Sequence, residues 1–391
     1  MALGETLSPQ RSRVPAQTLI MTVFALQPVA FGAWLPRIPD MCAALDLTPA
    51  LLALCLLGLP VGILSMLPFA GRFVARIGAR RVLIGGFVVF LAVMPLAAFA
   101  SSALQLFLGL MAAGVAMSVL ELALNISADR LERHSGRLIM NTCHGCWSLG
   151  IMAGSLIGSG LAGLGLSPAL SGSLVAAAIV PLALLAAVAL PALPAPPVTQ
   201  PARPGPTRKA MGMDIIGLGL FVIGIAMTEG AIADWSALYL RDVFTADSAA
   251  AGLGYAGFAA LVTCGRLGGD RLKAAIGTLP LARLCGGAAL LGLGLVVAAP
   301  VAALAYLGFA VTGFGVSVGF PLAVSAAAAL PGRLPEKTVA ALSFMALLGF
   351  LIGPVLIGTL ADLAGLRIGL AGLLPILALS FAYIPALSPR P

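Results

Sequence analysis

Residues 104–128 read LQLFLGLMAAGVAMSVLELALNISA, a run in which Glu121 is the only charged residue. A helix that crosses the hydrocarbon core of a bilayer needs about 20 predominantly apolar residues. This run is long enough, and polar residues flank it on both sides. The stretch therefore predicts a transmembrane helix that carries one carboxyl group inside the membrane.

Similar runs recur along the whole chain. Of its 391 residues, 60% are hydrophobic and only 9% are charged, and the mean hydropathy is +1.09. Soluble domains carry about 25% charged residues, and open β-structure cannot span lipid because its unpaired backbone groups find no water. The runs are also continuous, unlike the alternating segments of a barrel. We expect an all-α membrane protein with twelve transmembrane helices in two six-helix bundles, near residues 18–39, 48–70, 82–100, 104–128, 139–162, 167–191, 213–239, 248–268, 278–298, 301–329, 338–360 and 365–387.

A proline-rich stretch, LPAPPVTQPARPGPTRKA, separates the two sets of spans. Proline cannot continue a helix, and this stretch has no apolar face. We therefore predict an N-terminal bundle over residues 1–192, a cytoplasmic linker over 193–212 and a C-terminal bundle over 213–391. Residues 1–16 are polar and the next apolar run is too long for a cleavable signal, so the first helix is expected to stay in the protein.

The placement of lysine and arginine predicts the orientation in a bacterial inner membrane. Cytoplasmic loops carry an excess of both residues, which places both termini in the cytoplasm. The outer loops then hold only Arg37, Arg241 and Arg367. The cytoplasmic set is Arg11, Arg13, Arg72, Arg76, Arg80, Arg81, Arg130, Arg133, Arg137, Arg203, Arg208, Lys209, Arg266, Arg271, Lys273, Arg283, Arg333, Lys337 and Arg390. The net charge of +8 is thus a signal of topology, and we expect no nucleic-acid partner.

The two halves repeat short patterns. The first span contains Gly32-Ala-Trp34 followed by Asp40, and the seventh contains Ala233-Asp-Trp235 followed by Asp242. Glycines four residues apart occur in the fifth and eleventh spans, where they line one helix face and permit close backbone approach. Duplicated bundles with a site at their interface are a transporter architecture.

A motif after the second span resembles the signature of the major facilitator superfamily, G-x3-D-[RK]-x-G-x-[RK]-[RK]. Gly71, Arg76, Gly78, Arg80 and Arg81 match it, while Ala75 replaces the acidic residue. A partial copy in the second half is Arg266-Leu-Gly-Gly followed by Asp270 and Arg271. The resemblance implies a cytoplasmic gating motif formed by these residues, and the alanine weakens any charged latch in the N-terminal half.

Two further stretches resemble fucose-permease-like symporters and related inner-membrane proteins of rhizopine catabolism. Glu121 and Asn125 match an acid and an asparagine four residues apart in the fourth helix of the fucose permease, and the second stretch runs from Glu229 to Leu240. The acid of that permease's first helix is missing here, where Gln27 is the polar residue. This departure argues against fucose itself and against a coupling scheme with two acids.

Acidic residues inside the spans are the first candidates for chemistry. A charge at the centre of a bilayer costs about 2.5–3.5 kcal/mol on insertion scales. Glu121 lies about 12 Å from the inner end of the expected fourth helix at 1.5 Å per residue, and Asn125 shares its face. Glu229 is the counterpart in the seventh helix, and Asp234 lies nearer the outer rim. A carboxyl group that is neutral in one access state and ionised in the other provides proton coupling, although each acid can instead be a buried group satisfied by a neighbouring helix.

His144, Gln27, Trp34 and Trp235 complete the set of predicted site residues. A histidine titrates near neutral pH and can relay protons to Glu121, or it can simply cap or pack the fifth helix. The two tryptophans occupy matching repeat positions and can stack on a sugar ring, or they can belong to the interfacial belt. The pair Cys143 and Cys146 supplies only two of the four ligands of a structural zinc site, so we expect packing residues and no metal or cofactor.

These features predict a secondary active transporter, not an enzyme, that moves a small polar, sugar- or polyol-like solute with protons by alternating access. The runner-up is a proton-driven antiporter that exports amphipathic compounds, because the glycine-rich helices leave few polar cavity residues. A non-transporting membrane sensor is a distant third, since no signalling domain is visible in the sequence. The resemblance to the superfamily implies a monomer.

Overall fold

The computed structural model describes residues 14–137, 139–191, 213–330 and 335–388. In this part of the chain all regular structure is helical, and eleven helical segments are long and apolar enough to cross a membrane. A twelfth apolar segment, Leu366–Ala382, is shorter and consists of two helices. The all-α prediction and the prediction of about twelve spans are therefore confirmed. The predicted linker lies outside the described residues.

Proline divides the first span of the N-terminal half into short pieces. Pro28 and Pro36 lack the backbone N–H that a continuous helix requires, and the helix is interrupted at both positions. The helices of this half are α1 (Ala16–Leu26), α2 (Val29–Trp34), η1 (Leu35–Arg37), α3 (Ile38–Ala44), α4 (Pro49–Leu56), α5 (Gly58–Ile77), α6 (Ala79–Val93), η2 (Met94–Phe99), α7 (Ala103–Ser135), α8 (Met140–Gly163) and α9 (Pro168–Ala189).

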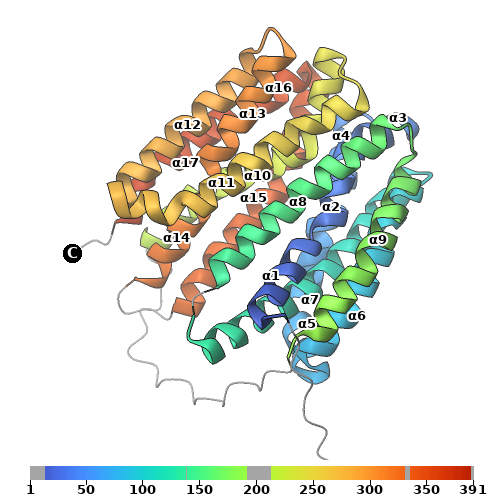
Figure 1. The fold of residues 1–391 in the computed structure, drawn as a ribbon. Helices are drawn as coiled ribbons and strands as arrows, with labels where there is room; N and C mark the ends of the chain where they lie inside the picture. Colours follow the sequence, from blue (N-terminus) through green and yellow to red (C-terminus); the bar gives the residue numbers. More distant parts are fainter. Residues whose placement is uncertain (1–13, 138, 192–212, 331–334, 389–391) are drawn as a thin grey trace, which may run out of the picture.

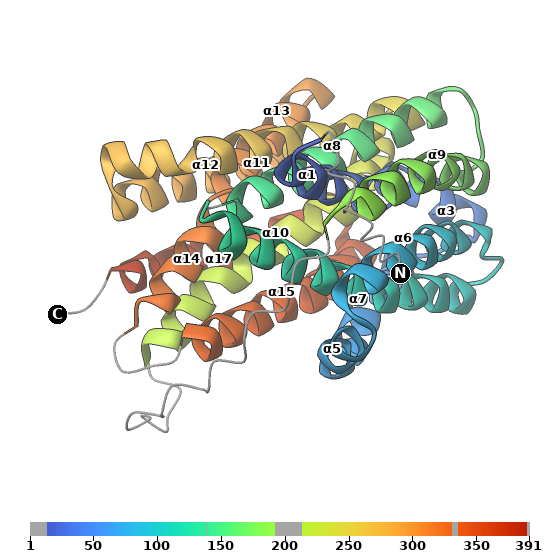
Figure 2. The same ribbon diagram turned by 60° about the horizontal axis from the view of Figure 1, so that its bottom comes forward.

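The C-terminal half repeats the layout with longer helices at its centre. Its elements are α10 (Met213–Phe244), α11 (Ser248–Ile276), α12 (Thr278–Ala298), α13 (Ala302–Val316), α14 (Gly319–Ala328), α15 (Pro335–Ala364), α16 (Leu366–Ala371), α17 (Leu373–Ala382) and η3 (Ile384–Leu387). Figure 1 shows the blue and green helices of the first half beside the yellow to red helices of the second. Figure 2 places α5, α6 and α7 on one flank and α12, α14 and α17 on the other.

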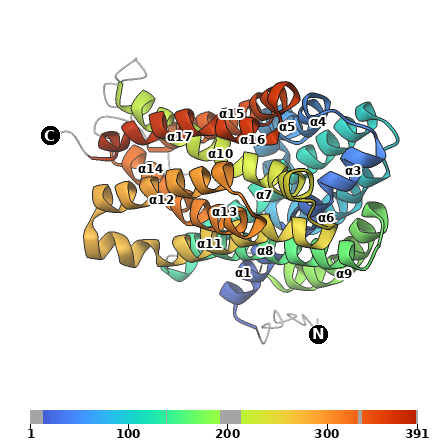
Figure 3. The same cartoon turned by 90° about the horizontal axis from the view of Figure 1, so that it is seen from above.

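The two ends of the molecule differ in charge. We call the end at which α5, α7 and α11 finish the basic end, because Arg72, Arg76, Arg80, Arg81 and Arg271 lie there. The opposite end is the one at which α3, α8, α10 and α15 finish. In the view of Figure 3 the two halves lie left and right, with α8 and α11 meeting between them.

Two helices extend beyond their predicted limits at the basic end. α7 was expected to end at 128 and α11 at 268, but they continue to Ser135 and Ile276. Arg266, which was counted in the cytoplasmic basic set near the end of the predicted span, lies ten residues before the end of its helix. Glu121 lies fourteen residues before the end of α7, about 21 Å along the helix at 1.5 Å per residue.

The glycine stripe of the fifth span brings backbones together within the N-terminal half. A Cβ atom at Gly150, Gly154 or Gly158 would lie within 2.4 Å of a carbonyl oxygen of α1 or α2. Such contacts are possible only without a side chain, as in other small-residue helix interfaces. The stripe therefore fixes α8 against the broken first span and positions the residues of both that face the molecular centre.

The halves are joined closely at the opposite end. Arg241 of α10 donates a hydrogen bond from Nη1 to the carbonyl oxygen of Pro39 in α3. Ser248 of α11 donates to Asp40 Oδ1 at 3.3 Å, and Asp40 forms an ion pair with Arg37 at 2.7 Å. The Arg37 side chain is 5% exposed. The bonds of Arg241 and Ser248 cross from one half to the other and close the opposite end, while the Arg37–Asp40 pair lies within the N-terminal half.

Candidate functional site

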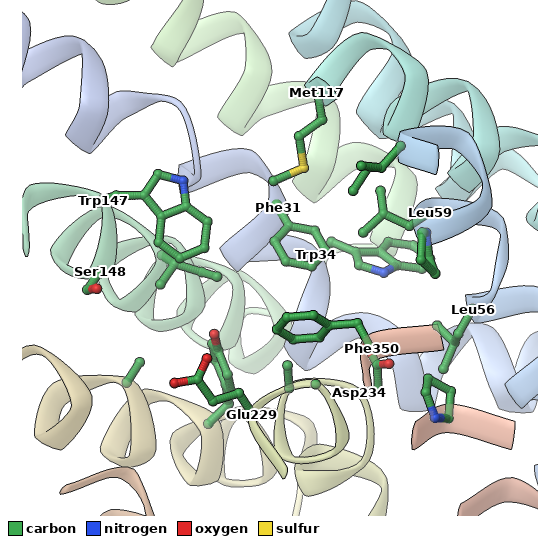
Figure 4. A pocket seen from close by; sticks show the side chains of 18 of the residues that line it. Phe31, Trp34, Leu56, Leu59, Met117, Trp147, Ser148, Glu229, Asp234 and Phe350 are labelled. Carbon is green, nitrogen blue, oxygen red and sulfur yellow. The ribbon is translucent and has the colours of Figure 1, made fainter. Parts of the chain in front are cut away.

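A cavity of about 340 Å³ lies between the halves. The N-terminal half lines it with residues of α2, α4, α5, α7 and α8, and the C-terminal half with residues of α10, α11 and α15. Figure 4 shows Phe31, Trp34, Trp147 and Phe350 around this space, with Glu229 entering it from α10. The volume suits a small organic molecule, since ligand pockets generally measure about 300–1,000 Å³.

Most of the lining is apolar or aromatic. Besides the tryptophan and tyrosine side chains, the polar lining residues are Glu121, Ser148, Glu229, Asp234 and Arg266. Three of these five are acids and one is a base, so the cavity carries more carboxylates than cations. Acids in a membrane interior generally face such a cavity and mark an ion or substrate pathway.

Arg266 is the centre of the polar network. Its Nη2 forms an ion pair with Glu229 Oε1 at 3.1 Å, and its Nη1 donates to Ser148 Oγ at 2.9 Å. The Ser148 hydroxyl in turn donates to the carbonyl oxygen of His144 at 3.2 Å. Because Ser148 belongs to α8 and Glu229 to α10, the guanidinium of α11 connects both halves beside the cavity.

Glu121 and Asp234 differ from Glu229 in having no such partner. In the described ranges, neither carboxylate takes part in a hydrogen bond or an ion pair, although both line the cavity. Burying an unpaired carboxylate is costly, and the group neutralises by taking up a proton instead. These two side chains are therefore free to bind a proton or a polar group of a ligand.

A comparison with known families identifies the fold. A model described as Major Facilitator Superfamily matches residues 18–333. The chain belongs to the major facilitator superfamily. It is a multi-pass membrane transporter that acts on small solutes, and it is not an enzyme.

Curated relatives in the superfamily cover nearly the whole chain. An uncharacterised MFS-type transporter of Yersinia pestis is 30% identical over 357 residues, covering 91% of each chain. The membrane protein MosC of Rhizobium meliloti is 30% identical over 359 residues, covering 90% of this chain and 86% of that protein. The predicted resemblance to the rhizopine-related branch is therefore confirmed.

Solved structures of superfamily transporters share the fold at low sequence identity. The nucleoside transporter NupG superposes with a TM-score of 0.76 at 14% identity, over 95% of this chain and 99% of that one. The Escherichia coli fucose:proton symporter FucP gives a TM-score of 0.61 at 18% identity, over 96% and 98%. At these identities the likeness shows the major facilitator fold and nothing about the ligand.

The structure brings four of the eight predicted site residues to the cavity of this superfamily member. Glu121, Glu229, Asp234 and Trp34 line it. Trp235, the repeat partner of Trp34, is fully buried away from the cavity lining. The matching sequence positions therefore do not give matching environments, because the first span is broken by proline while α10 is continuous.

The other three predicted residues lie behind or beside the lining. Gln27 is buried and accepts a hydrogen bond from Trp147 Nε1 at 2.7 Å, so it orients an indole that does line the cavity. Asn125 donates from Nδ2 to the backbone carbonyl oxygen of Glu121 at 2.9 Å, not to its carboxylate. The exposed His144 packs edge-on against Phe24 with ring centroids 5.7 Å apart.

The residues of the superfamily gating motif lie at the basic end. Gly78 has a φ of +95° and makes the tight turn between α5 and α6. Arg80 donates from Nη2 to the carbonyl oxygen of Val188 in α9 at 2.6 Å, a contact within the N-terminal half. Gly71, Arg76 and Arg81 are exposed, as are Asp270 and Arg271 in the last turns of α11. Their gating role stays a prediction.

Sequence reasoning missed Arg266, Ser148 and Trp147 as cavity residues. Arg266 was assigned to the gating motif because the expected helix ended two residues later. A signal was present, since an arginine within a long apolar helix needs a carboxylate, and Glu229 was the acid predicted in the adjacent helix. The cross-half contacts of Arg241 and Asp40 were also missed, because nothing in their local sequence indicates a distant partner.

Proposed function

We propose that the protein is a proton-coupled secondary transporter that moves a small polar, sugar- or polyol-like solute by alternating access. The observation that carries this proposal is the cavity between the halves, in which Glu121 and Asp234 have no partner among the described residues while Glu229 is held by Arg266. A hydroxylated solute would accept and donate hydrogen bonds to these groups and stack its ring faces on Trp34 and Trp147.

Glu229 and Arg266 are suited to couple the proton to the solute. If Glu229 took up a proton, it would lose its negative charge and its attraction for the Arg266 guanidinium. The guanidinium would then bind Ser148 alone or turn to the ligand. Because Ser148 and Glu229 belong to different halves, a change at this pair alters a contact that spans the moving interface. Glu121 of α7 lines the same cavity and is the other candidate for the proton-binding group.

The contacts at the opposite end supply the gate in this proposal. With both termini in the cytoplasm, as the lysine and arginine placement predicts, the closed end faces outward. Outward opening would then break the Arg241–Pro39 and Ser248–Asp40 hydrogen bonds while the basic end closes. Hydroxylated substrates are named for two proteins of the same fold, the nucleoside transporter NupG and the fucose:proton symporter FucP.

A second candidate is a proton-driven antiporter that exports amphipathic compounds. The predominance of aromatic and aliphatic lining residues favours it, because an apolar cation would stack on Phe31, Trp34 and Phe350 and place its charge near an unpaired carboxylate. The two candidates differ in ligand chemistry and in the direction of proton movement relative to the solute.

Transport into proteoliposomes tests both. Labelled sugars, polyols and lipophilic cations would be offered under an inward proton gradient and, in a second set of vesicles, under an outward one, and internal pH would be followed by a trapped dye. Solute uptake with internal acidification, lost in Glu121→Gln and Glu229→Gln but kept in the exposed control Asp362→Asn, is the expected result. Accumulation of cations driven by proton exit would establish the antiporter, and gradient-independent uptake unaffected by both glutamine variants would refute proton coupling.

A further inference from the structure

A second cavity, of about 320 Å³, lies at the basic end and belongs entirely to the N-terminal half. Its walls are the α5–α6 turn with the first two turns of α6, the last turns of α7 and the end of α9. It is separate from the central cavity and shares no lining residue with it. An account of the transported solute therefore does not explain it.

The charge of this cavity is one-sided. Arg80, Arg81 and Arg130 line it, together with the hydroxyl-bearing Ser127, and none of the described lining residues is acidic. Asp129, next to Arg130 in sequence, is engaged elsewhere, since it pairs with Arg133 at 3.0 Å. Three guanidinium groups around one space repel each other unless an anion lies between them.

The side chain of Arg130 has a buried hydrogen-bond donor without an acceptor in the described part of the chain. Its Nε atom is shielded from solvent and has no hydrogen-bond acceptor among the described residues. Buried donors in native proteins are nearly always paired, and an orphan points to an ion or water that completes the site. Arg81 likewise makes no hydrogen bond or ion pair within the described part of the chain, whereas Arg80 is fixed by its bond to the Val188 carbonyl oxygen.

The backbone at the cavity adds to the attraction for an anion. α6 begins at Ala79 without a side-chain cap, so the amide groups of its first turn are unpaired by side chains. The N-terminus of a helix of this length carries a partial positive charge and binds phosphate groups readily. The arginine side chains and the N-terminus of α6 therefore both attract an anion into the same cavity.

The surroundings of the cavity are apolar, with buried leucines in its wall and exposed side chains on the neighbouring part of α9. Leu83, Leu131 and Leu190 form part of its wall, and on α9 the side chains of Leu185 and Val188 are 71% and 53% exposed. Side chains of this kind on the outer surface of a transmembrane helix face the acyl chains of lipid. A ligand with an anionic head and apolar tails would fill the cavity and cover these residues, whereas a free anion would satisfy only the arginines.

We propose that this pocket, formed by Arg80, Arg81, Arg130, Ser127 and the start of α6, binds the phosphodiester headgroup of an anionic phospholipid. The guanidinium groups contact the phosphate oxygens, and Arg130 Nε gains the acceptor that it lacks. The lipid ties α6, α7 and α9 together at the membrane surface. Basic pockets between transmembrane helices on the cytoplasmic side are known to hold lipid headgroups.

Native mass spectrometry of the detergent-solubilised protein tests this. The full chain would be titrated with an equimolar mixture of dioleoyl phosphatidylglycerol and dioleoyl phosphatidylcholine, which differ in charge but not in acyl chains. We expect a preference for phosphatidylglycerol that falls about fivefold in Arg130→Gln, because one arginine near an anionic surface contributes about that factor. Arg72→Gln removes an exposed charge at the same end that does not line the pocket and should keep the preference.

The other outcomes of this experiment each overturn a part of the proposal. An unchanged preference in Arg130→Gln, or an equal fall in Arg72→Gln, overturns the site in favour of diffuse surface charge. Displacement of the lipid by millimolar inorganic phosphate or glycerol 1-phosphate overturns the lipid as ligand and makes the pocket a site for a soluble phosphate. Arg81→Gln, at the exposed rim and without a structural partner, provides the same test if Arg130→Gln does not fold. The lipid titration needs no transported solute, so its result can be interpreted even if the proposed transport function is wrong.

Discussion

Loss of the Arg241 side chain should release the opposite end of the molecule. In Arg241→Gln the hydrogen bond to the Pro39 carbonyl oxygen is lost, and this bond joins the two halves. A hydrogen bond to a charged group contributes about 1.5–3 kcal/mol. The side chain of Arg241 is 30% exposed, which favours the lower value of about 1.5 kcal/mol, and every 1.4 kcal/mol is about tenfold in an equilibrium constant. The ratio of open to closed molecules at this end should therefore rise about tenfold.

Arg367 provides the matched control for this change. It is an arginine at the same end, it donates from Nη1 to the Val297 carbonyl oxygen at 3.0 Å, and its guanidinium lies 5.3 Å from the Phe244 ring centroid. All of these contacts lie within the C-terminal half. Arg367→Gln removes the same charge without touching the interface between the halves, so the ratio of open to closed molecules should stay as in the parent.

Electron spin resonance of labels at Leu164 and Leu363 would measure the opening. These side chains are 76% and 79% exposed, they lie at the opposite end on different halves, and labels there should not disturb packing. In nanodiscs, Arg241→Gln should add a population at longer distance, while Arg367→Gln keeps the parent distribution. If both variants shift the distribution equally, or if neither does, the reasoning that Arg241 holds this gate closed is refuted.

Two further predictions concern packing and the central ion pair. Gly154→Ala places a Cβ atom 2.2 Å from the Val29 carbonyl oxygen and should lower the stability of the fold by about 1–3 kcal/mol. The control Gly160→Ala meets no heavy atom within 4 Å and should keep the parent stability. Equal thermal unfolding midpoints for the two variants would contradict the close packing of α8 against α2. Arg266→Gln should destabilise by about 1.5–3 kcal/mol, and adding Glu229→Gln should restore part of this because the uncompensated buried charge is gone. Additive effects within about 0.5 kcal/mol would show that the two side chains do not interact.

The fold was predictable because lipid imposes a simple rule on the sequence. Apolar runs of spanning length mark the helices, and the glycine spacing of Gly150, Gly154 and Gly158 marks the close contacts that the structure contains. The ends of α7 and α11 were not predictable from hydropathy, since charged residues such as Asp129 and Arg271 continue a helix once it leaves the hydrocarbon. That error placed Arg266 near the end of its span and so hid it from the candidate site.

The candidate site was predictable only where burial itself carries information. An acid within an apolar run is costly wherever it points, so Glu121, Glu229 and Asp234 stood out and all three line the cavity. Aromatic and amide side chains are uncharged, so their burial costs less and they occur in a core, in a lining or between the two. Gln27 therefore turned out to hold Trp147, and Trp235 turned out to be fully buried outside the cavity lining.

The distribution of contacts explains how such a molecule can move without losing its fold. The backbone-to-backbone approaches of α8 against α1 and α2 lie within one half, and no side chain can rearrange to relieve them. The contacts between the halves include single hydrogen bonds of Arg241, Ser248 and Arg266, beside a close backbone approach of Gly358 to Pro49. Exchanging one such bond for another costs little, whereas separating α8 from α1 would expose a backbone groove. The halves should therefore turn as rigid units about the interface between α8 and α11, with Arg266 close to the line about which they turn.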